Sequence, residues 1–559
     1  MYGKTIVSHN TNSRAFSFST GIEKYTNTGW FTNAKASYKR YGDANTPDYN
    51  LTNTGLQSTA FSLRTGFKNF EYGFEAFYSY LDNKIGILSA SHLGSRTDLV
   101  NAINAPQPLI INNFSYNINN PNQAVKHQLI KLLGYKRFKN LGKLQFQYNY
   151  QNNHRLEFDK RVGADKFKPA TDLTLQTHTL KSDFKFDAQR QRTYKVGISA
   201  QYQNNFANPD TGIRRIIPDY DKYDIGFFGV STYTFDNFLI DAGVRYDYSQ
   251  YDAKKFYQKS RWTASGYDVN FSHFIIGTTG SQYLTNPKFD YHNVSFSAGI
   301  NYSLNENNKL IFNYGLSSRA PNPSELFSDG LHHSASRIET GDLNLNQETS
   351  NRFGATFMHS KNKWNLNIEG YLNFIDDFIF IAPNGIETTI RGEFPVYNYQ
   401  KTNAVLYGLD AVINYNISNH FKFQNKTAYI IGDDTKNKTS LIDIPPLQFT
   451  NTLTYINNNF HTSLESIFVG KQTRFPDYNF TTTLPSGQNV LVDISTPPSA
   501  YHLFNFKSGT SFSINKTSLD INLSINNLFN TNYRDYLNRL RFFADELGRN
   551  FKLQLIIKY

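Results

Sequence analysis

The chain has 559 residues, of which 16% are aromatic and 18% are charged, against about 25% charged residues in ordinary globular proteins. It contains no cysteine, which excludes a disulfide framework, a zinc finger, an iron–sulfur cluster and a cysteine nucleophile. The net charge of +12 comes from scattered lysines and arginines without a basic run, so we expect no nucleic-acid partner.

The chain offers no helix for crossing a membrane. A spanning helix needs about 20 mostly apolar residues, and the longest apolar runs, such as 378–382, have about five. The first residues do not form a signal peptide, because no basic segment precedes a long apolar stretch.

Alternation of apolar and polar residues is the strongest signal, and it is typical of strands with one apolar and one polar face. The clearest runs lie at 194–202, 294–304, 364–374 and 519–526. Several reach about 9–11 residues, the length of a strand tilted across a bilayer, whereas soluble strands are nearer about 5–6. The apolar faces are rich in tyrosine and phenylalanine, which favours a membrane barrel with aromatic girdles over a soluble sandwich.

Short polar turns alternate with longer loops along the chain, as in barrels with short periplasmic turns and long extracellular loops. The turns lie at 26–29, 68–70, 139–143, 187–192, 235–238, 305–309, 360–363, 418–420, 457–459 and 515–516. The longer loops include 83–125, 160–178, 251–290, 317–346 and 381–402. Two strands between successive turns and further strands at both ends, including one at 1–8, predict an all-β, transmembrane antiparallel barrel of about 22 strands.

The last residues support closure of this barrel. Phe551, Leu553, Leu555 and Ile557 alternate with the residues Lys552, Gln554, Ile556 and Lys558, and the chain ends on the aromatic Tyr559. A terminal strand suits a barrel in which the last strand pairs with the first and leaves no edge. Tyr559 also resembles the sorting signal that the outer-membrane assembly machinery recognises.

Three segments resemble the β-barrel of TonB-dependent outer-membrane receptors, especially those of Bacteroidetes-type bacteria. The sequence NNLFNTNYR at 526–534, followed by GRN at 548–550, is similar to the closing pattern of that family. The sequences SRAP at 318–321 with ELF at 325–327, and NA at 403–404 with YGLD at 407–410, are similar to two further family segments. The resemblance covers essentially the whole chain.

The resemblance implies TonB-dependent uptake of a scarce nutrient, above all a metal ion or metal chelate such as an iron siderophore, haem, zinc or cobalamin. It implies a monomer in the bacterial outer membrane, in contact with lipid, with the barrel assembly machinery and with a small nutrient ligand. Family members carry a signal peptide, a TonB box and a plug domain. We see none of them, so we expect residues 1–559 to form the barrel domain alone, with the TonB complex acting through a plug absent from this chain.

Other functions remain open at this point. A passive porin, uptake of a glycan and a surface adhesin are the alternatives to metal uptake. Common hydrolase, metalloprotease, phosphate-loop and dinucleotide motifs are missing from the sequence, so we expect neither an enzyme nor a cofactor.

The segment 325–339 carries the candidate ligand site in an extracellular loop. Asp329, His332, His333 and Glu339 could offer carboxylate and imidazole groups, with His332 and His333 as candidate metal ligands. The segment also resembles a loop of family receptors linked to zinc or haem uptake. Adjacent residues of a strand point to opposite faces, so at most one of the two histidines would reach a given ion. The alternative is a polar loop that docks on a plug or folds over the lumen.

Two further residues of this region are predicted to be structural. We expect Arg319 and Glu325 to face the lumen or the plug, with Arg319 paired with plug carboxylates; contact of Arg319 with an anionic ligand is the alternative. His92 and His127 are interpreted as ordinary residues in and after the first long loop.

Overall fold

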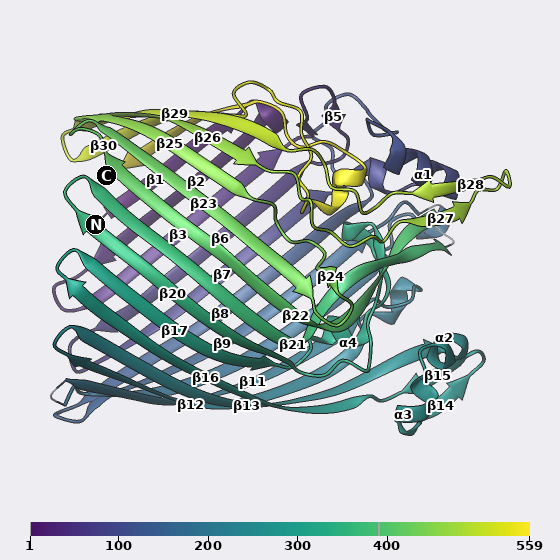
Figure 1. The fold of residues 1–559 in the computed structure, drawn as a ribbon, viewed down its shortest axis with the longest axis horizontal. Coiled ribbons are helices and arrows are strands. Elements are labelled where there is room, and N and C mark those ends of the chain that lie inside the picture. Colours follow the sequence, from purple (N-terminus) through teal and green to yellow (C-terminus); the bar gives the residue numbers. More distant parts are fainter. Residues whose placement is uncertain (1, 162, 190, 390–391) are drawn as a thin grey trace.

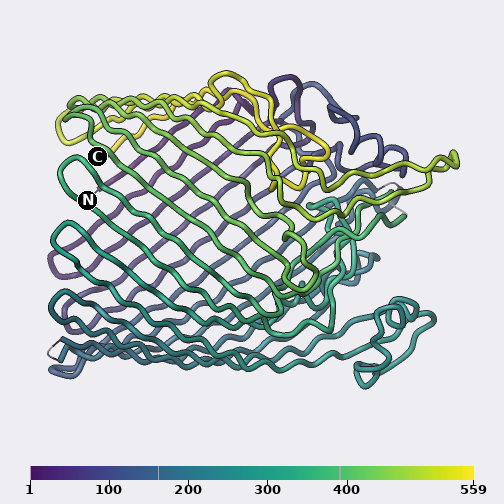
Figure 2. Tube along the Cα trace, viewed as in Figure 1, coloured from purple at the N-terminus to yellow at the C-terminus, as the bar shows by residue number. Residues whose placement is uncertain are grey.

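The computed structural model describes residues 2–559 apart from positions 162, 190 and 390–391, and in it 22 antiparallel strands form one closed barrel (Figures 1 and 2). The wall strands are β1 (Tyr2–Asn10), β2 (Ala15–Tyr25), β3 (Trp30–Tyr41), β6 (Leu56–Lys68), β7 (Tyr72–Gly86), β8 (Asn122–Phe138), β9 (Gly142–Phe158), β10 (Thr171–Phe186), β11 (Arg192–Ala207), β12 (Asp219–Phe235), β13 (Phe238–Gln258), β16 (Lys288–Asn305), β17 (Asn308–Arg319), β20 (Glu348–Lys361), β21 (Trp364–Thr389), β22 (Gly392–Asn416), β23 (Phe421–Asp434), β25 (Gln448–Asn457), β26 (Phe460–Val469), β29 (Tyr501–Ile514), β30 (Thr517–Asn526) and β31 (Asn550–Lys558). This architecture confirms the predicted fold class and strand number.

The first and last strands close the barrel. β1 pairs with β31 in antiparallel register from Lys4 opposite Lys558 to Asn10 opposite Lys552. Beyond this ladder the amide of Gly3 donates to the carbonyl oxygen of Tyr559 at 2.6 Å. The predicted strand at 1–8 is therefore β1, although Met1 itself lies outside the described residues.

The two faces of the wall differ as the alternation predicts. Val196 and Ile198 on β11 expose 47% and 40% of their surface on the outside. Ser199, between Ile198 and Ala200, faces the other way, and its hydroxyl accepts a hydrogen bond from Arg245 at 2.8 Å. A barrel in lipid needs an apolar exterior, and its lumen is polar. Closure of the sheet lets the strands pair their backbone groups with one another.

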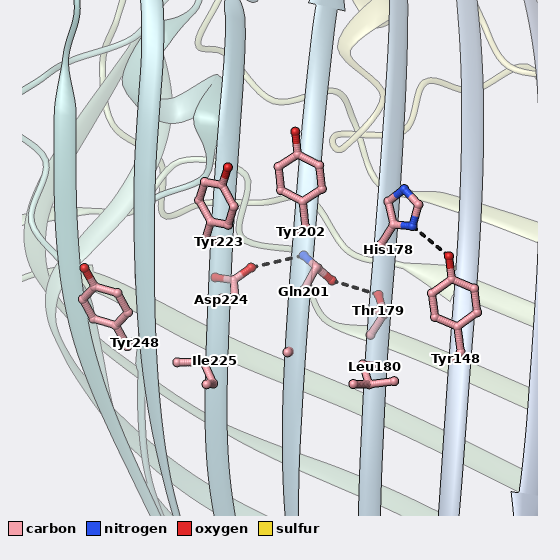
Figure 3. A pocket seen from close by; sticks show the side chains of 11 residues that line it. Tyr148, His178, Thr179, Leu180, Gln201, Tyr202, Tyr223, Asp224, Ile225 and Tyr248 are labelled. Carbon is pink, nitrogen blue, oxygen red and sulfur yellow. Dashed lines mark hydrogen bonds between the residues drawn. The ribbon is translucent and has the colours of Figure 1, made fainter.

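Aromatic rings gather at two levels of the outer wall. Beside the short turns, Trp30 packs edge-on against Phe74 with ring centroids 5.6 Å apart, and Phe238 stacks on Tyr302 at 4.5 Å. Farther toward the loops, a row of rings crosses neighbouring strands (Figure 3), in which Tyr148 and His178 share a hydrogen bond of 2.8 Å. Two such levels are typical of the interfacial girdles of outer-membrane barrels.

The connections carry the remaining elements. The helices are α1 (Arg96–Asn104), α2 (Lys259–Ala264), α3 (Tyr267–Asn270) and α4 (Pro323–Phe327), with 3₁₀ turns η1 (Asn12–Arg14), η2 (Ser89–Ser91), η3 (Gly163–Asp165), η4 (Pro209–Thr211), η5 (Ser272–Phe274), η6 (His333–Ala335) and η7 (Arg539–Phe542). The short strands are β4 (Ala44–Asn45), β5 (Asn50–Leu51), β14 (Ile275–Thr279), β15 (Gln282–Thr285), β18 (Asp329–His332), β19 (Arg337–Thr340), β24 (Thr439–Ser440), β27 (Phe480–Thr483) and β28 (Asn489–Val492). None of the helices in the described part of the chain is long and apolar enough to span a membrane.

The predicted turns fall between consecutive wall strands, although the turn at 187–192 contains position 190, and the loops 160–178 and 381–402 contain positions 162 and 390–391, all outside the described residues. One loop prediction is wrong. The region 381–402 continues β21 and β22 as a long hairpin, paired as far as Thr389 opposite Gly392. Register shifts between Ile375 and Phe378 and between Pro383 and Ile386 interrupt its alternation, and bulges of this kind hide a strand from a periodicity search.

The loops pack together at one end of the barrel, while the short turns lie at the other (Figure 1). Their core contains the fully buried Trp262, Leu326 and Phe327, packed with residues of α3 and β13. A second core joins the connection 87–121 to Phe543 near the end of the chain. Segments far apart in the sequence therefore meet in one folded layer above the wall.

Candidate functional site

The connection between β17 and β20 forms the centre of the loop layer. It contains α4, β18, η6 and β19, and β19 pairs in parallel with β22 from Ile338 opposite Val396. The amide of Asp329 donates to the carbonyl oxygen of Ile216 at 3.0 Å, which joins this connection to the one after β11. The predicted ligand segment is therefore a fixed part of the structure.

Arg319 anchors the start of this connection. Its guanidinium donates to Glu325 at 2.9 Å and lies 3.2 Å from Glu348, its register partner on β20. Glu325 also accepts a hydrogen bond from the amide of Asn322 and so caps α4. Both carboxylate partners of Arg319 in this structure, Glu325 and Glu348, therefore belong to this chain. Pairing of Arg319 with a plug stays a prediction.

Asp329 lies in a network of cations rather than beside the histidines. It is buried, and one of its oxygens accepts a hydrogen bond from Arg261 at 3.0 Å. Arg214 and Lys255 lie 3.5 and 3.9 Å from the same carboxylate. Arg214 and Arg261 also pair with Glu387 from the extended β21. Three cations thus surround two carboxylates.

A basic cavity of about 580 Å³ adjoins this network, between the connection 208–218 and the ends of β13 and β15. The charged residues along its lining are Arg214, Arg215, Asp219, Lys254, Lys255 and Asp329. Four cations against two carboxylates leave an excess of positive charge, which attracts an anionic ligand.

His332 and Glu339 interact with each other. His332 donates through Nδ1 to Glu339 at 2.9 Å, and its Nε2 accepts a hydrogen bond from Arg155 at 2.7 Å. Burial alone would raise the pKa of Glu339, but the hydrogen bond from His332 and the charge of Arg337 lower that pKa below its ordinary value. Glu339 is therefore an ionised carboxylate, and both ring nitrogens of His332 are engaged.

His333 faces a different set of partners. One ligand atom from each of His92, Asp159 and His333 lies within 4.8 Å of the other two. Nδ1 of His333 is 3.5 Å from Oδ2 of Asp159. The three side chains are buried, with relative exposures of 7%, 4% and 1%. The expectation that adjacent histidines diverge is met, although His333 is the first residue of a 3₁₀ turn and not of a strand.

Hydroxyl groups orient the ring of His92. Its Nδ1 shares hydrogen bonds with Ser336 at 3.1 Å and Ser91 at 3.3 Å, and the two serine hydroxyls lie 2.6 Å apart. Nε2 of His92 is buried and has no hydrogen-bond partner among the described residues. Burial lowers the pKa of His92 to about 4, so its imidazole is neutral at neutral pH, the form that binds metal ions.

Sequence reasoning missed several residues of this site. The sequence predicts His92 to be an ordinary loop residue; in the structure the connection 87–121 folds back, so that His92 is buried beside His333. Asp159, Arg155 and Arg214 come from other connections and strand ends. No local spacing relates them to the segment 325–339, so only the three-dimensional fold reveals the grouping.

Comparisons with known proteins agree with this architecture. The profile of a family described as TonB dependent receptor-like, beta-barrel, matches residues 2–528. The TonB-dependent heme receptor A of Haemophilus influenzae (strain 86-028NP) is 24% identical over 371 residues, which cover 61% of this chain and 46% of that receptor. The chain thus spans less than half the length of this curated relative.

Solved structures of similar shape cover the whole of this chain. They include the copper transporter OprC, with a TM-score of 0.74, 14% identity and 80% of that chain covered. They also include the FrpB iron transporter of Neisseria meningitidis (F3-3 variant), with a TM-score of 0.69, 13% identity and 81% covered. The siderophore receptor PirA of Pseudomonas aeruginosa has a TM-score of 0.65, 12% identity and 80% covered. At such identities the likeness concerns the fold alone.

Proposed function

This chain belongs to the TonB-dependent receptor β-barrel family, and we propose that it serves the energised uptake of an anionic metal chelate across the bacterial outer membrane. Barrels of this family lie in the outer membrane, with their long loops outside the cell and their short turns in the periplasm. The loop layer of this protein is then the surface that meets a nutrient first.

The basic cavity carries this proposal. Its lining brings Arg214, Arg215, Lys254 and Lys255 together at the extracellular end of a closed barrel. Guanidinium groups bind carboxylate and phenolate oxygens through directed, charge-assisted hydrogen bonds, and a small excess of positive charge raises the local concentration of anions. Iron chelates and haem carry such groups, and the similar proteins described above are a heme receptor, a copper transporter, an iron transporter and a siderophore receptor.

The barrel supplies only part of the transport machinery in this proposal. Its wall spans the membrane, and its loops capture the ligand. Passage through the lumen requires a plug domain inside the barrel, on which the TonB complex acts with inner-membrane energy. We propose that residues 1–559 form the barrel domain of that assembly, with the polar lumen as the surface that meets the plug.

Growth rescue tests the proposal. A strain without its own receptors, expressing the full-length gene, is supplied in turn with haem, a ferric catecholate, a copper salt, a zinc salt, cobalamin and a glycan. We expect rescue by an anionic metal chelate, and no rescue when the TonB gene is deleted. Growth on a glycan alone, or growth that does not depend on TonB, would contradict the proposal and favour glycan uptake or a passive pore.

Charge variants locate the ligand cavity. The double variant Arg215→Ala/Lys254→Ala removes two cations from the cavity, and we expect it to slow uptake of the rescuing chelate several-fold, with the strongest effect at low ionic strength. The control Lys139→Ala/Lys516→Ala removes the same charge from two short periplasmic turns. Equal uptake by both double variants would exclude this cavity as the capture site.

A further inference from the structure

We propose that His92, Asp159 and His333 bind one divalent transition-metal ion of the zinc class, and that this ion joins three extracellular connections. The site lies apart from the basic cavity, whose charged lining contains none of these three residues. The inference goes beyond the proposed function, because the ion is a resident of the loop layer and not the transported nutrient.

The distances suit a metal centre after a small adjustment. In a tetrahedral site with metal–ligand bonds of about 2.0–2.1 Å, neighbouring ligand atoms are about 3.3–3.5 Å apart. Nδ1 of His333 and Oδ2 of Asp159 already have this separation, at 3.5 Å. All three ligand atoms lie within 4.8 Å of one another. Small side-chain rotations would bring them to the separations of a tetrahedral site.

The donor set selects the class of ion. Two imidazoles and one carboxylate match the nitrogen and oxygen ligands of zinc and similar first-row ions, whereas calcium and magnesium prefer sets made of oxygen alone. Three protein ligands leave a fourth position for water. The carboxylate of Asp159 supplies the negative charge that a divalent cation needs in a buried place.

The surroundings of His92 give a second, independent observation. Its Nδ1 is held by Ser336 and Ser91, while Nε2 is buried without a hydrogen-bond partner among the described residues. Leaving such a nitrogen unpaired is unfavourable, and a metal bond removes that cost. Metal-binding histidines are commonly oriented in this way, with the second ring nitrogen held by a neighbouring polar group.

The carboxylate of Glu157 adds to the negative potential of the site. Glu157 is fully buried two residues before Asp159, and its Oε2 also has no hydrogen-bond partner within the described part of the chain. Its other oxygen pairs with Arg155 and accepts a hydrogen bond from Ser334 at 2.8 Å. The ammonium group of Lys160, which donates to the carbonyl oxygen of Ser89 at 3.4 Å, opposes this potential.

The three ligands come from different parts of the loop layer. His92 follows η2 in the connection 87–121, Asp159 follows β9, and His333 begins η6. An ion bound to all three would fix the connection that carries Asp329 against two other connections. The metal site would therefore hold the loop layer in the arrangement that shapes the basic cavity.

Zinc titration of the full-length protein, purified in detergent and stripped with a chelator, tests the site. We expect one Zn²⁺ per chain by calorimetry. His92→Ala and His333→Ala should each weaken binding by at least about tenfold. The matched control is His273→Ala, which removes an exposed histidine from another connection, and it should keep wild-type affinity. Unchanged binding in His92→Ala, or an equal loss in His273→Ala, would overturn the assignment.

Two further measurements keep the test decisive if a variant folds poorly. Heat-dependent migration on gels reports whether each variant forms a barrel, and Co²⁺ added to the wild-type protein should give the visible bands of a low-symmetry nitrogen and oxygen site. Failure of the wild-type protein to bind either Zn²⁺ or Co²⁺ would reject the site directly. These readouts use purified protein, so they are independent of whether the growth test supports chelate uptake.

Discussion

His332 and His333 are adjacent in the chain, yet their side chains belong to separate networks. Nδ1 of His332 donates to Glu339 at 2.9 Å, whereas Nδ1 of His333 lies 3.5 Å from Asp159. The backbone changes from β18 to η6 between the two residues, so one imidazole remains partly exposed while the other is buried. The two histidines therefore have different consequences when they are removed.

Removal of His332 should loosen the segment that carries the ligand residues. In His332→Ala, Glu339 loses one hydrogen-bond partner and keeps Arg337, at a cost of about 1–3 kcal/mol for the unpaired buried groups. We expect faster hydrogen exchange and faster protease cleavage of 328–340, while the barrel stays intact.

The control for this variant is His273→Ala, which removes an exposed histidine from another connection. Its exchange pattern should match that of the wild type. Equal protection of 328–340 in His332→Ala and in the wild-type protein would show that the hydrogen bond to Glu339 does not hold the segment.

The barrel itself could be predicted because its physics is local and repeated. A strand in the wall needs lipid on one side and water on the other, so the period-2 pattern at Val196, Ile198 and similar positions records its exposure directly. Short turns then give the strand number. The same argument fails for β21 and β22, where bulges break the alternation.

The site could be predicted only in part. Six predicted residues stand close together in the sequence. Arg319 ends β17, and the connection that follows contains Glu325, Asp329, His332, His333 and Glu339. Their partners Arg155, Asp159 and Arg214 come from other strand ends and connections. Tertiary packing alone decides which of these partners contacts which predicted residue. The ligand site at the adjacent histidines therefore stays a prediction, and the grouping of their side chains depends on the packing of separate loops.

Arg319 should contribute to barrel stability through its two carboxylates. In Arg319→Ala, Glu325 and Glu348 lose a common cation in a half-buried place, and we expect a loss of about 1–3 kcal/mol, less than for a fully buried pair. The temperature at which the folded gel band disappears should fall.

The matched control is Arg352→Ala, which breaks a more exposed pair with Glu369 between β20 and β21. An exposed pair contributes about 0–1 kcal/mol. If both variants lower the temperature at which the folded gel band disappears by the same amount, the burial of Glu325 and Glu348 beside Arg319 adds nothing to the stability of the barrel.

Gly341 should be required for the position of α4. A Cβ at this residue would lie 2.6 Å from the backbone carbon of Leu326 and 2.7 Å from the carbonyl oxygen of Glu325. Because these are backbone atoms, the helix must move, and we expect Gly341→Ala to cost about 1–3 kcal/mol by overpacking.

Proteolysis of the loop layer measures this effect. Gly341→Ala should be cleaved faster around 323–345 than the wild type, and chelate uptake should fall with it. Gly94→Ala is the control, because an added Cβ there meets nothing within 4 Å. An unchanged cleavage pattern in Gly341→Ala would mean that the segment adapts without displacing α4.

Tyr559 should govern assembly of the barrel in the membrane. Its backbone exchanges hydrogen bonds of 2.6 and 3.0 Å with Gly3 at the seam, and its ring lies where a side chain at Gly3 would stand, with Cε2 only 2.1 Å from the added Cβ. Tyr559→Ala keeps the backbone bonds and removes the terminal aromatic group. We expect several-fold less folded barrel in the outer-membrane fraction, because the sequence predicts that this group is the assembly signal.

Tyr559→Phe separates the aromatic ring from the hydroxyl, which lies 3.5 Å from Thr5. We expect this variant to assemble at wild-type levels, and Tyr25→Ala, which removes an exposed ring beside a short turn, to do the same. If Tyr559→Ala also reaches wild-type levels, assembly depends on the seam between β1 and β31 alone. If Tyr559→Phe fails together with Tyr559→Ala, the hydroxyl contact across the seam, and not a terminal aromatic signal, determines assembly.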